Sequence, residues 1–236
     1  MKKIIHRADS RGFADHGWLK SYHTFSFAGY YDQSRMHFGA LRVLNDDQVA
    51  AGNGFGRHPH DNMEIISIPQ SGTLAHGDSM GNEGTIQANE IQVMSAGTGI
   101  THSEFNGSKT EDVKFLQIWL FPNKENVTPR YDQIKIDPAN RKNKFQQIIS
   151  PNPDDEGTWI HQDAWFHLSD LDAEVELSYE FKGEGTGLYL FVLEGQLEIA
   201  DEILDRRDAI GITDVNKINI KTSKGASVLL MEVPMF

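Results

Sequence analysis

The sequence predicts an all-β protein with two antiparallel β-sandwich or barrel domains. Short apolar or alternating runs recur from residue 24 onward, separated about every eight to twelve residues by clusters of Gly, Asn and Asp. No stretch keeps a helical period of apolar residues over three turns. A weak internal echo links the halves, because residues 68–74 resemble 191–197 and residues 89–93 resemble 207–211 in the same order. Such an echo indicates a duplicated fold.

The individual runs predict where each domain lies. In the first half, strands are predicted at residues 40–44, 64–68, 91–94 and 114–120. Asn, Asp and Gly predict hairpin turns at residues 45–47 and 80–84. Five prolines from Pro122 to Pro153 and a charged run at 140–144 predict a linker. Strands resume at residues 175–181, 188–193, 196–199, 217–220 and 228–233. We therefore expect one domain over residues 1–135 and a second over 145–236.

Composition excludes several classes of function. A chain of 236 residues buries a stable core without metal or disulfide help, so a metal here would serve function. With 22 Lys plus Arg against 34 Asp plus Glu, the net charge of -12 disfavours direct binding of nucleic acid. There is no cysteine, so metal ligands must be His, Asp or Glu. No run of eighteen apolar residues occurs and none follows the charged first residues, which predicts a soluble, cytoplasmic protein without a membrane partner.

Two short stretches place imidazoles beside a carboxylate. Side chains alternate along a strand, so His58 and His60 share one face, and His102 and Glu104 share another. If two strands bring these faces together, three nitrogens and one oxygen converge on one point. A His-x-His pair alone is common on solvated strands, but the second pair favours one divalent transition metal per chain. Iron(II) suits this donor set best, with nickel, cobalt, copper, manganese or zinc as alternatives.

The same stretches resemble the two motifs of the cupin family. The first has the spacing Gly52, His58, His60, Glu64 and Gly72, with one residue more than usual before the last glycine. The second has Gly99, His102 and Asn106. Within the cupins, residues 9–131 are similar to bacterial pirins. The similarity consists of several uncommon short motifs that occur in the same order, at residues 16–19, 23–27, 45–47, 58–60 and 94–100. The resemblance implies a bicupin, with a metal-binding first cupin domain.

The pirin resemblance also implies which residues ligate. Pirins carry a ligating glutamate at the position of Glu104, whereas most cupins use the one at Glu64. We therefore expect His58, His60, His102 and Glu104 to bind the metal, and Glu64 to accept a hydrogen bond that orients an imidazole. His76 follows a predicted strand into a turn and could line the mouth of the pocket, but we interpret it as an ordinary hairpin histidine.

The second domain lacks counterparts of these ligands. Alignment on Gly195 puts Phe181 and Gly183 at the places of the first two histidines, and Ile220 near the place of the third. The histidines that remain there, at positions 161 and 167, have no ligand-like spacing, and we interpret His161 and His167 as structural or surface residues. The second domain is thus expected to bind no metal.

Three functions follow from the resemblance to pirins and cupins. The first is a quercetin 2,3-dioxygenase, a metal-dependent enzyme that cleaves flavonols with dioxygen, with Glu104 as the base that takes the enolic proton. Aromatic residues between positions 18 and 38 could wall a cavity for such a planar substrate. The second is a metal-dependent regulatory protein that acts through protein contacts. The third, a sugar-phosphate isomerase, is disfavoured because no Lys or Arg cluster accompanies the ligand strands.

Overall fold

The computed structural model describes residues 1–236 and consists almost entirely of strands and loops. The helical elements are two short 3-10 turns, η1 (Ala8–Ser10) and η2 (Pro138–Arg141). Neither has the length or the apolar character that a membrane-spanning helix requires. The predicted all-β class is confirmed.

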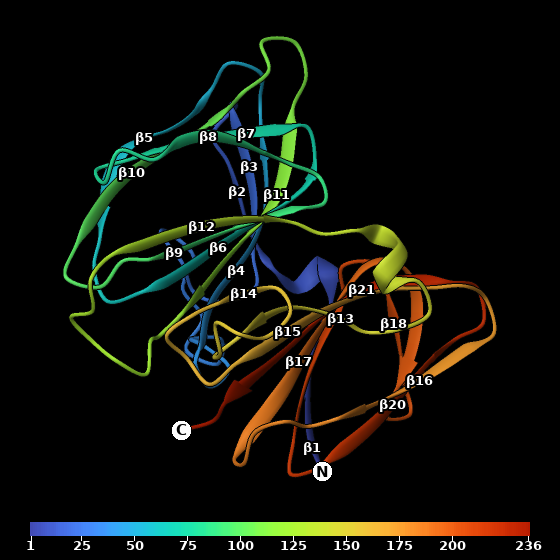
Figure 1. Ribbon diagram of the computed structural model, residues 1–236. Coiled ribbons are helices and arrows are strands. Elements are labelled where there is room, and N and C mark those ends of the chain that lie inside the picture. Colours follow the sequence, from blue (N-terminus) through green and yellow to red (C-terminus); the bar gives the residue numbers. More distant parts are fainter.

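The first domain is a sandwich of two antiparallel sheets that face each other (Figure 1). The larger sheet contains, in spatial order, β12 (Arg130–Lys135), β9 (Glu90–Ser95), β6 (Glu64–Ser71), β11 (Val113–Leu120), β4 (Leu41–Val49), β3 (Leu19–His23) and β2 (Gly12–Asp15). The smaller sheet contains β5 (Gly54–His60), β10 (Ile100–Asn106), β7 (Thr73–Asp78) and β8 (Glu83–Gln87). The two layers are an open sandwich, not a closed barrel.

The second domain repeats this design with ten strands. Its main path contains β1 (Lys2–His6), β19 (Ala209–Thr213), β17 (Thr186–Ile199), β21 (Ala226–Pro234), β15 (Trp165–Leu171), β13 (Gln146–Ser150) and β14 (Thr158–Trp159). The facing layer contains β16 (Val175–Glu180), β18 (Glu202–Asp205) and β20 (Lys217–Thr222). The long strand β17 pairs within both layers and so joins them.

The two ends of the chain each cross to the other domain. Strand β1 pairs with β19, and in Figure 1 it lies, in blue, among the orange and red strands of the second domain. The division predicted at residues 135 and 145 stays a prediction, but this first strand does not follow it. In the opposite direction, the ring of Phe236 stacks on His37 of the first domain, and the Ala40 amide donates to the Pro234 carbonyl at 2.9 Å.

Most predicted strands are confirmed, and one predicted turn is wrong. The strands expected at 64–68, 91–94 and 114–120 lie within β6, β9 and β11, and the one expected at 40–44 matches β4 except for its first residue. The turn expected at 80–84 overlaps the connection between β7 and β8. The turn expected at 45–47 does not exist, because Asn45 and Asp47 lie in the middle of β4 and pair with β3 and β11. Asn and Asp are common in turns, but here both side chains are buried inside the sandwich.

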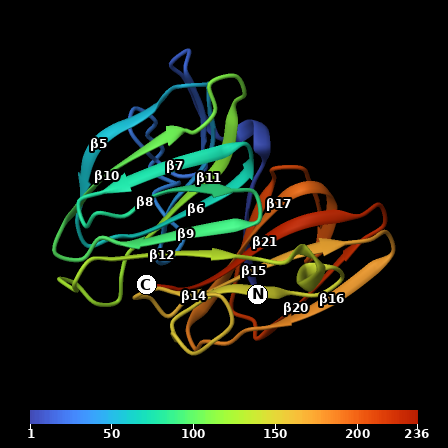
Figure 2. The same cartoon turned by 45° about the horizontal axis from the view of Figure 1, so that its top comes forward.

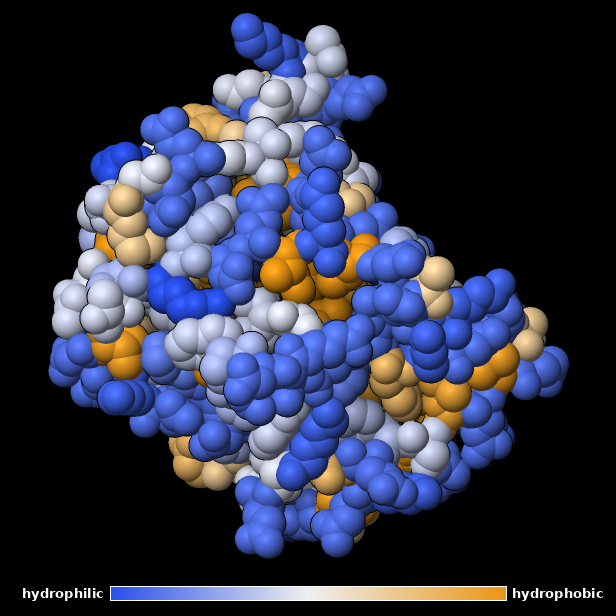
Figure 3. All heavy atoms as spheres, in the orientation of Figure 1, coloured by the Kyte–Doolittle hydropathy of each residue, from blue (hydrophilic) through white to orange (hydrophobic).

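The larger sheet of the first domain is buried on both of its faces. One face packs on the second domain through a shared cluster of 26 buried apolar residues, and the other looks toward the smaller sheet. Figure 2 shows β9 and β12 running beside the strands of the second domain. On the face shown in Figure 3, hydrophilic side chains cover most of the outer surface. Only the face toward the smaller sheet is free to line a site, because the other face packs on the second domain.

Candidate metal centre

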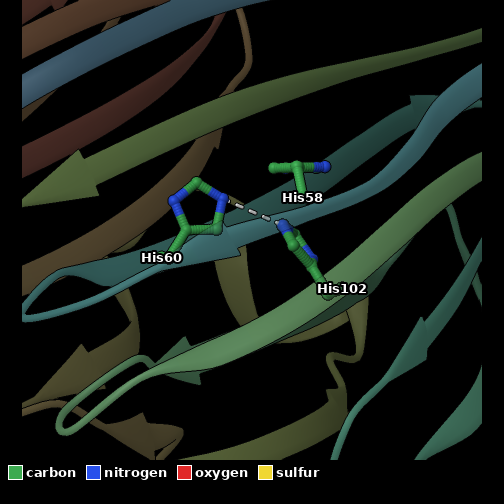
Figure 4. Close-up of side chains that lie close together, drawn as sticks. All are labelled: His58, His60 and His102. Carbon is green, nitrogen blue, oxygen red and sulfur yellow. Dashed lines mark hydrogen bonds between the residues drawn. The ribbon is translucent and has the colours of Figure 1, made fainter.

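The three predicted histidines meet on the smaller sheet. Strands β5 and β10 are antiparallel neighbours, with His102 directly opposite His58 and Ile100 opposite His60. Ring nitrogens of the three histidines lie within 4.8 Å of one another. The Nε2 atoms of His60 and His102 are 3.1 Å apart, and His58 lies beside them (Figure 4).

A tight turn before β10 holds these strands in register. Gly97 has a φ of +46°, and a Cβ there would lie 2.0 Å from the carbonyl oxygen of Val127. Only glycine is accommodated in this backbone conformation and this space. The carbonyl of Gly97 accepts a hydrogen bond from the Asn62 amide at 2.9 Å, which ties this turn to the one that ends β5.

The imidazoles have the protonation that metal ligands need. Burial, and next the neighbouring histidines, lower the pKa of His60 to about 4 and that of His102 to about 3, so both rings are neutral at pH 7. His58 Nδ1 lies 2.8 Å from the Gly56 carbonyl, which leaves its Nε2 as an acceptor. Two adjacent nitrogen ligands of one ion are spaced by about 3 Å, and the two Nε2 atoms match this. The donor set fits a divalent transition metal.

Glu104 lies beside this cluster but is held by the facing sheet. The register of β10 shifts between His102 and Glu104, and the carboxylate is 2% exposed. Ser67 Oγ donates to Oε1 and Gln117 Nε2 donates to Oε2, each at 2.8 Å. Its oxygen falls in a second group of candidate ligands, with His76 and His102, so the two groups meet at His102. Gln92 Nε2 also donates to Oε1, at 3.4 Å, so three side chains of the larger sheet hold this carboxylate in place.

The role expected for Glu64 is wrong. Its side chain lies on the opposite face of β6 from Ser67, where Ser95 Oγ donates to Oε2 at 2.7 Å and the main chain of His161 also donates. No histidine ring is hydrogen-bonded to it. The chain turns after His60 and enters the other sheet, so the alternation of one strand does not extend to Glu64. Burial raises the pKa of this carboxyl to about 7.

His76 belongs to the second group of candidate ligands, although the sequence favoured an ordinary hairpin histidine. Its side chain is fully buried on β7, next to β10, and Nε2 lies 3.3 Å from Asp78 Oδ2. The ring stacks on Tyr131 with 4.8 Å between centroids. The His-x-Asp spacing of residues 76 and 78 puts both side chains on one face of a strand, and this was the signal available in the sequence.

The histidines open onto a large cavity between the two sheets. Its volume is about 720 Å³, and His58, His60 and Glu104 lie in its wall. Six aromatic side chains also line it: Phe13, Trp18, Phe27, Tyr30, Phe55 and Trp119. The Trp119 ring meets His60 edge to face, with 4.9 Å between ring centroids. A space of this size and lining accommodates a planar aromatic molecule next to the imidazoles.

The second domain contributes nothing to these groups of ligands. His167 is buried on β15 against Tyr179 and Phe145, and burial lowers its pKa to about 3. His161 packs edge to face on Trp159. Neither histidine belongs to a group of three candidate ligands.

Comparison with known proteins gives the family. The chain is 42% identical over 234 residues to the quercetin 2,3-dioxygenase of Escherichia coli K12, covering 98% of each chain. The chain belongs to the pirin family. The pirin family model matches residues 5–120, and the model of the quercetinase C-terminal cupin domain matches residues 147–233. A pirin-like protein of Caulobacter vibrioides is 39% identical over 225 residues, with 95% of this chain and 96% of that one covered.

Solved structures agree with the fold of this pirin. It superposes on YhhW from Escherichia coli with a TM-score of 0.95 at 40% identity, covering 100% of this chain and 99% of that one. A structure of the bacterial pirin YhhW in complex with nickel(II) gives 0.94 at 39% identity, with both chains fully covered. The bicupin architecture expected from the sequence is confirmed.

Proposed function

We propose that this pirin is a metal-dependent dioxygenase that cleaves flavonols such as quercetin. The observation that carries the proposal is a cluster of three imidazoles, of which those of His58 and His60 line an aromatic cavity of about 720 Å³. Burial keeps the rings of His60 and His102 neutral. The name of the Escherichia coli relative, quercetin 2,3-dioxygenase, supports the same activity.

The metal would be held by His58, His60, His102 and Glu104. Iron(II) is the ion we favour, since nitrogen and oxygen donors with open positions suit it, and the nickel(II) complex of the Escherichia coli pirin supports a divalent ion. When bound, the ion supplies Lewis acidity that stabilises the enolate of the substrate. Glu104 would supply one negative charge beside the ion before it accepts the enolic proton, and the enolate would carry that charge afterwards.

The residues of the chain would bind and orient the flavonol. Trp119 and Phe55 offer flat apolar walls for its rings. Glu104 would accept the proton of the enolic hydroxyl, because it is the carboxyl group beside the imidazoles. Ser67 and Gln117 fix the orientation of that carboxylate from the facing sheet.

Steady-state kinetics on iron-reconstituted protein tests the proposal. We expect flavonol loss and dioxygen uptake well above the rate with free iron in buffer, and a large fall in rate for Glu104→Gln and for metal-stripped protein. Metal content measured on the same Glu104→Gln sample separates loss of the ligand from loss of the base. Flavonol loss no faster than with free metal would replace the enzyme by the regulatory function.

A further inference from the structure

The cavity has a second polar region, on the sheet that faces the histidines. Ser21 and His23 on β3 lie directly opposite Asp47 and Asn45 on β4. All four side chains line the cavity and are at most 4% exposed. They come from two neighbouring strands of the larger sheet, whereas His58 and His60 come from the smaller one. The cavity therefore has polar groups on two opposite walls and aromatic rings between them.

Asp47 is the unusual member of this region. Its carboxylate accepts a hydrogen bond from Ser21 Oγ and forms no ion pair with any Lys, Arg or His. Burial raises its pKa to about 7, and the charges of Asp46 and Glu104 add to that shift. Burying a carboxyl group without a cation costs stability. A purely structural position would be filled at lower cost by an apolar residue.

Two neighbours of Asp47 also have unused hydrogen-bonding capacity. The Oδ1 atom of Asn45 and the Nδ1 atom of His23 are buried and have no partner. Buried polar atoms in proteins are nearly always paired, so unpaired ones beside a cavity point to a ligand that supplies the partner. The partner that suits a carboxylate and an amide oxygen is a hydroxyl donor.

Resting on the proposed function, we propose that Asp47, with Ser21 and Asn45, forms a subsite for hydroxyl groups on the part of the substrate that the histidines do not contact. The occupant is a polyhydroxylated planar aromatic, whose phenolic O–H donates to the Asp47 carboxylate. The wall with the imidazoles thus binds the reacting end of the substrate, and the wall with Asp47 binds the hydroxyl groups at its other end. Asp47 is a specificity-determining residue, and an aromatic without those hydroxyls leaves the buried carboxyl with Ser21 as its one hydrogen-bond donor.

Equilibrium binding of two flavonols tests this subsite. Quercetin has two hydroxyls on its pendant phenyl ring and galangin has none, while their other rings are the same. Binding to nickel-loaded protein without dioxygen is followed by quenching of the fluorescence of Trp18 and Trp119, which line the cavity. At a pH above 7, where the Asp47 carboxyl is ionised, we expect the wild-type protein to prefer quercetin, and Asp47→Asn to reduce that preference by about 10- to 100-fold, the range for a hydrogen bond to a charged group.

Matched controls separate selectivity from folding. Asp154→Asn makes the same change on an exposed loop and is expected to leave the preference unaltered. Ser21→Ala removes the donor to Asp47 and should lower the preference by a few fold, roughly the value of a neutral hydrogen bond. Equal binding of both flavonols by the wild type, or an unchanged preference in folded, metal-loaded Asp47→Asn, overturns the subsite. Selective binding without dioxygen uptake upholds the subsite and overturns the proposed enzyme.

Discussion

In the first domain, β10 pairs with β5 and carries His102 and Glu104 toward the space between the sheets. In the second domain β20 pairs with β16, and its buried residues are Ile218, Ile220 and Thr222, none of which is a metal ligand. The space between the two layers of the second domain is filled by a cluster of 15 buried residues, nearly all aliphatic. One pairing scheme therefore supports a polar, hollow interior in one copy and a packed apolar interior in the other.

The difference between the two interiors indicates that the residues that stabilise this fold are not the ones that form the metal site. The second domain shows that the sandwich closes mainly with aliphatic packing, around a few buried polar side chains such as Glu232. The polar interior of the first domain is stabilised by the packing of its larger sheet against the second domain, through the shared cluster of 26 residues. Substitutions in the interior of one domain and not the other test this division of roles.

Removing two histidines should have the largest effect. His58→Ala combined with His102→Ala deletes two of three imidazoles, and we expect the metal content to fall from one per chain to almost none. His161→Ala combined with His167→Ala is the matched change in the second half and should leave one metal per chain. Elemental analysis after dialysis against a chelator measures both. Two equivalents of metal in the wild type would contradict the contrast between the domains.

A cavity made in the second domain should reduce stability alone. Leu190 is completely buried within its aliphatic cluster. Leu190→Ala is expected to lower the free energy of unfolding by about 2 to 5 kcal/mol, because the void left behind is only partly closed. Denaturant unfolding of the metal-free protein gives this value, and metal titration of the folded variant should still give one equivalent. A variant that folds but binds no metal would show that the interiors are coupled.

Glu64 should make stability depend on pH at the boundary between the domains. Its folded pKa is raised to about 7 by burial, so between about pH 4.5 and 7 the native state keeps a proton that the unfolded chain releases. Its contribution is fully present below about pH 4.5 and is lost as pH rises through 7, by up to about 3 kcal/mol. Glu64→Gln should lack this term, so the wild-type minus variant difference in unfolding free energy should fall over that range. A difference that rises with pH would mean that folding lowers the pKa of Glu64 instead of raising it.

Loss of a donor to Glu104 should have the smallest effect. Ser67→Ala removes the hydroxyl that donates to Oε1, and we expect metal affinity to fall by about tenfold, the lower end for partners of ligating groups. Ser95→Ala, which removes the equivalent donor to Glu64 on the other face of the sheet, should leave metal affinity unchanged. Competition with a chromogenic chelator measures both variants. Equal losses would mean that Glu104 does not take part in metal binding.

Much of the first domain could be predicted from the sequence because its signals are local. The two-residue period of β10 puts His102 and Glu104 on one strand, and a turn glycine such as Gly97 marks where that strand begins. The His-x-His pair at 58 and 60 needed only one partner strand to form a cluster, and the structure brings these three histidines together. The strands expected in both halves follow from the same alternation of apolar and polar residues.

The tertiary structure alone decided which face and which partner each residue has. Glu64 points to the second domain because a turn after His60 moves the chain into another sheet, and no local period extends through a turn. Asn45 and Asp47 read as a turn until pairing with β3 and β11 makes them a cavity wall. Strand β1 joins a sheet about 200 residues away in sequence. Long-range pairing is set by total burial of both sheets, a quantity that no short stretch of sequence contains.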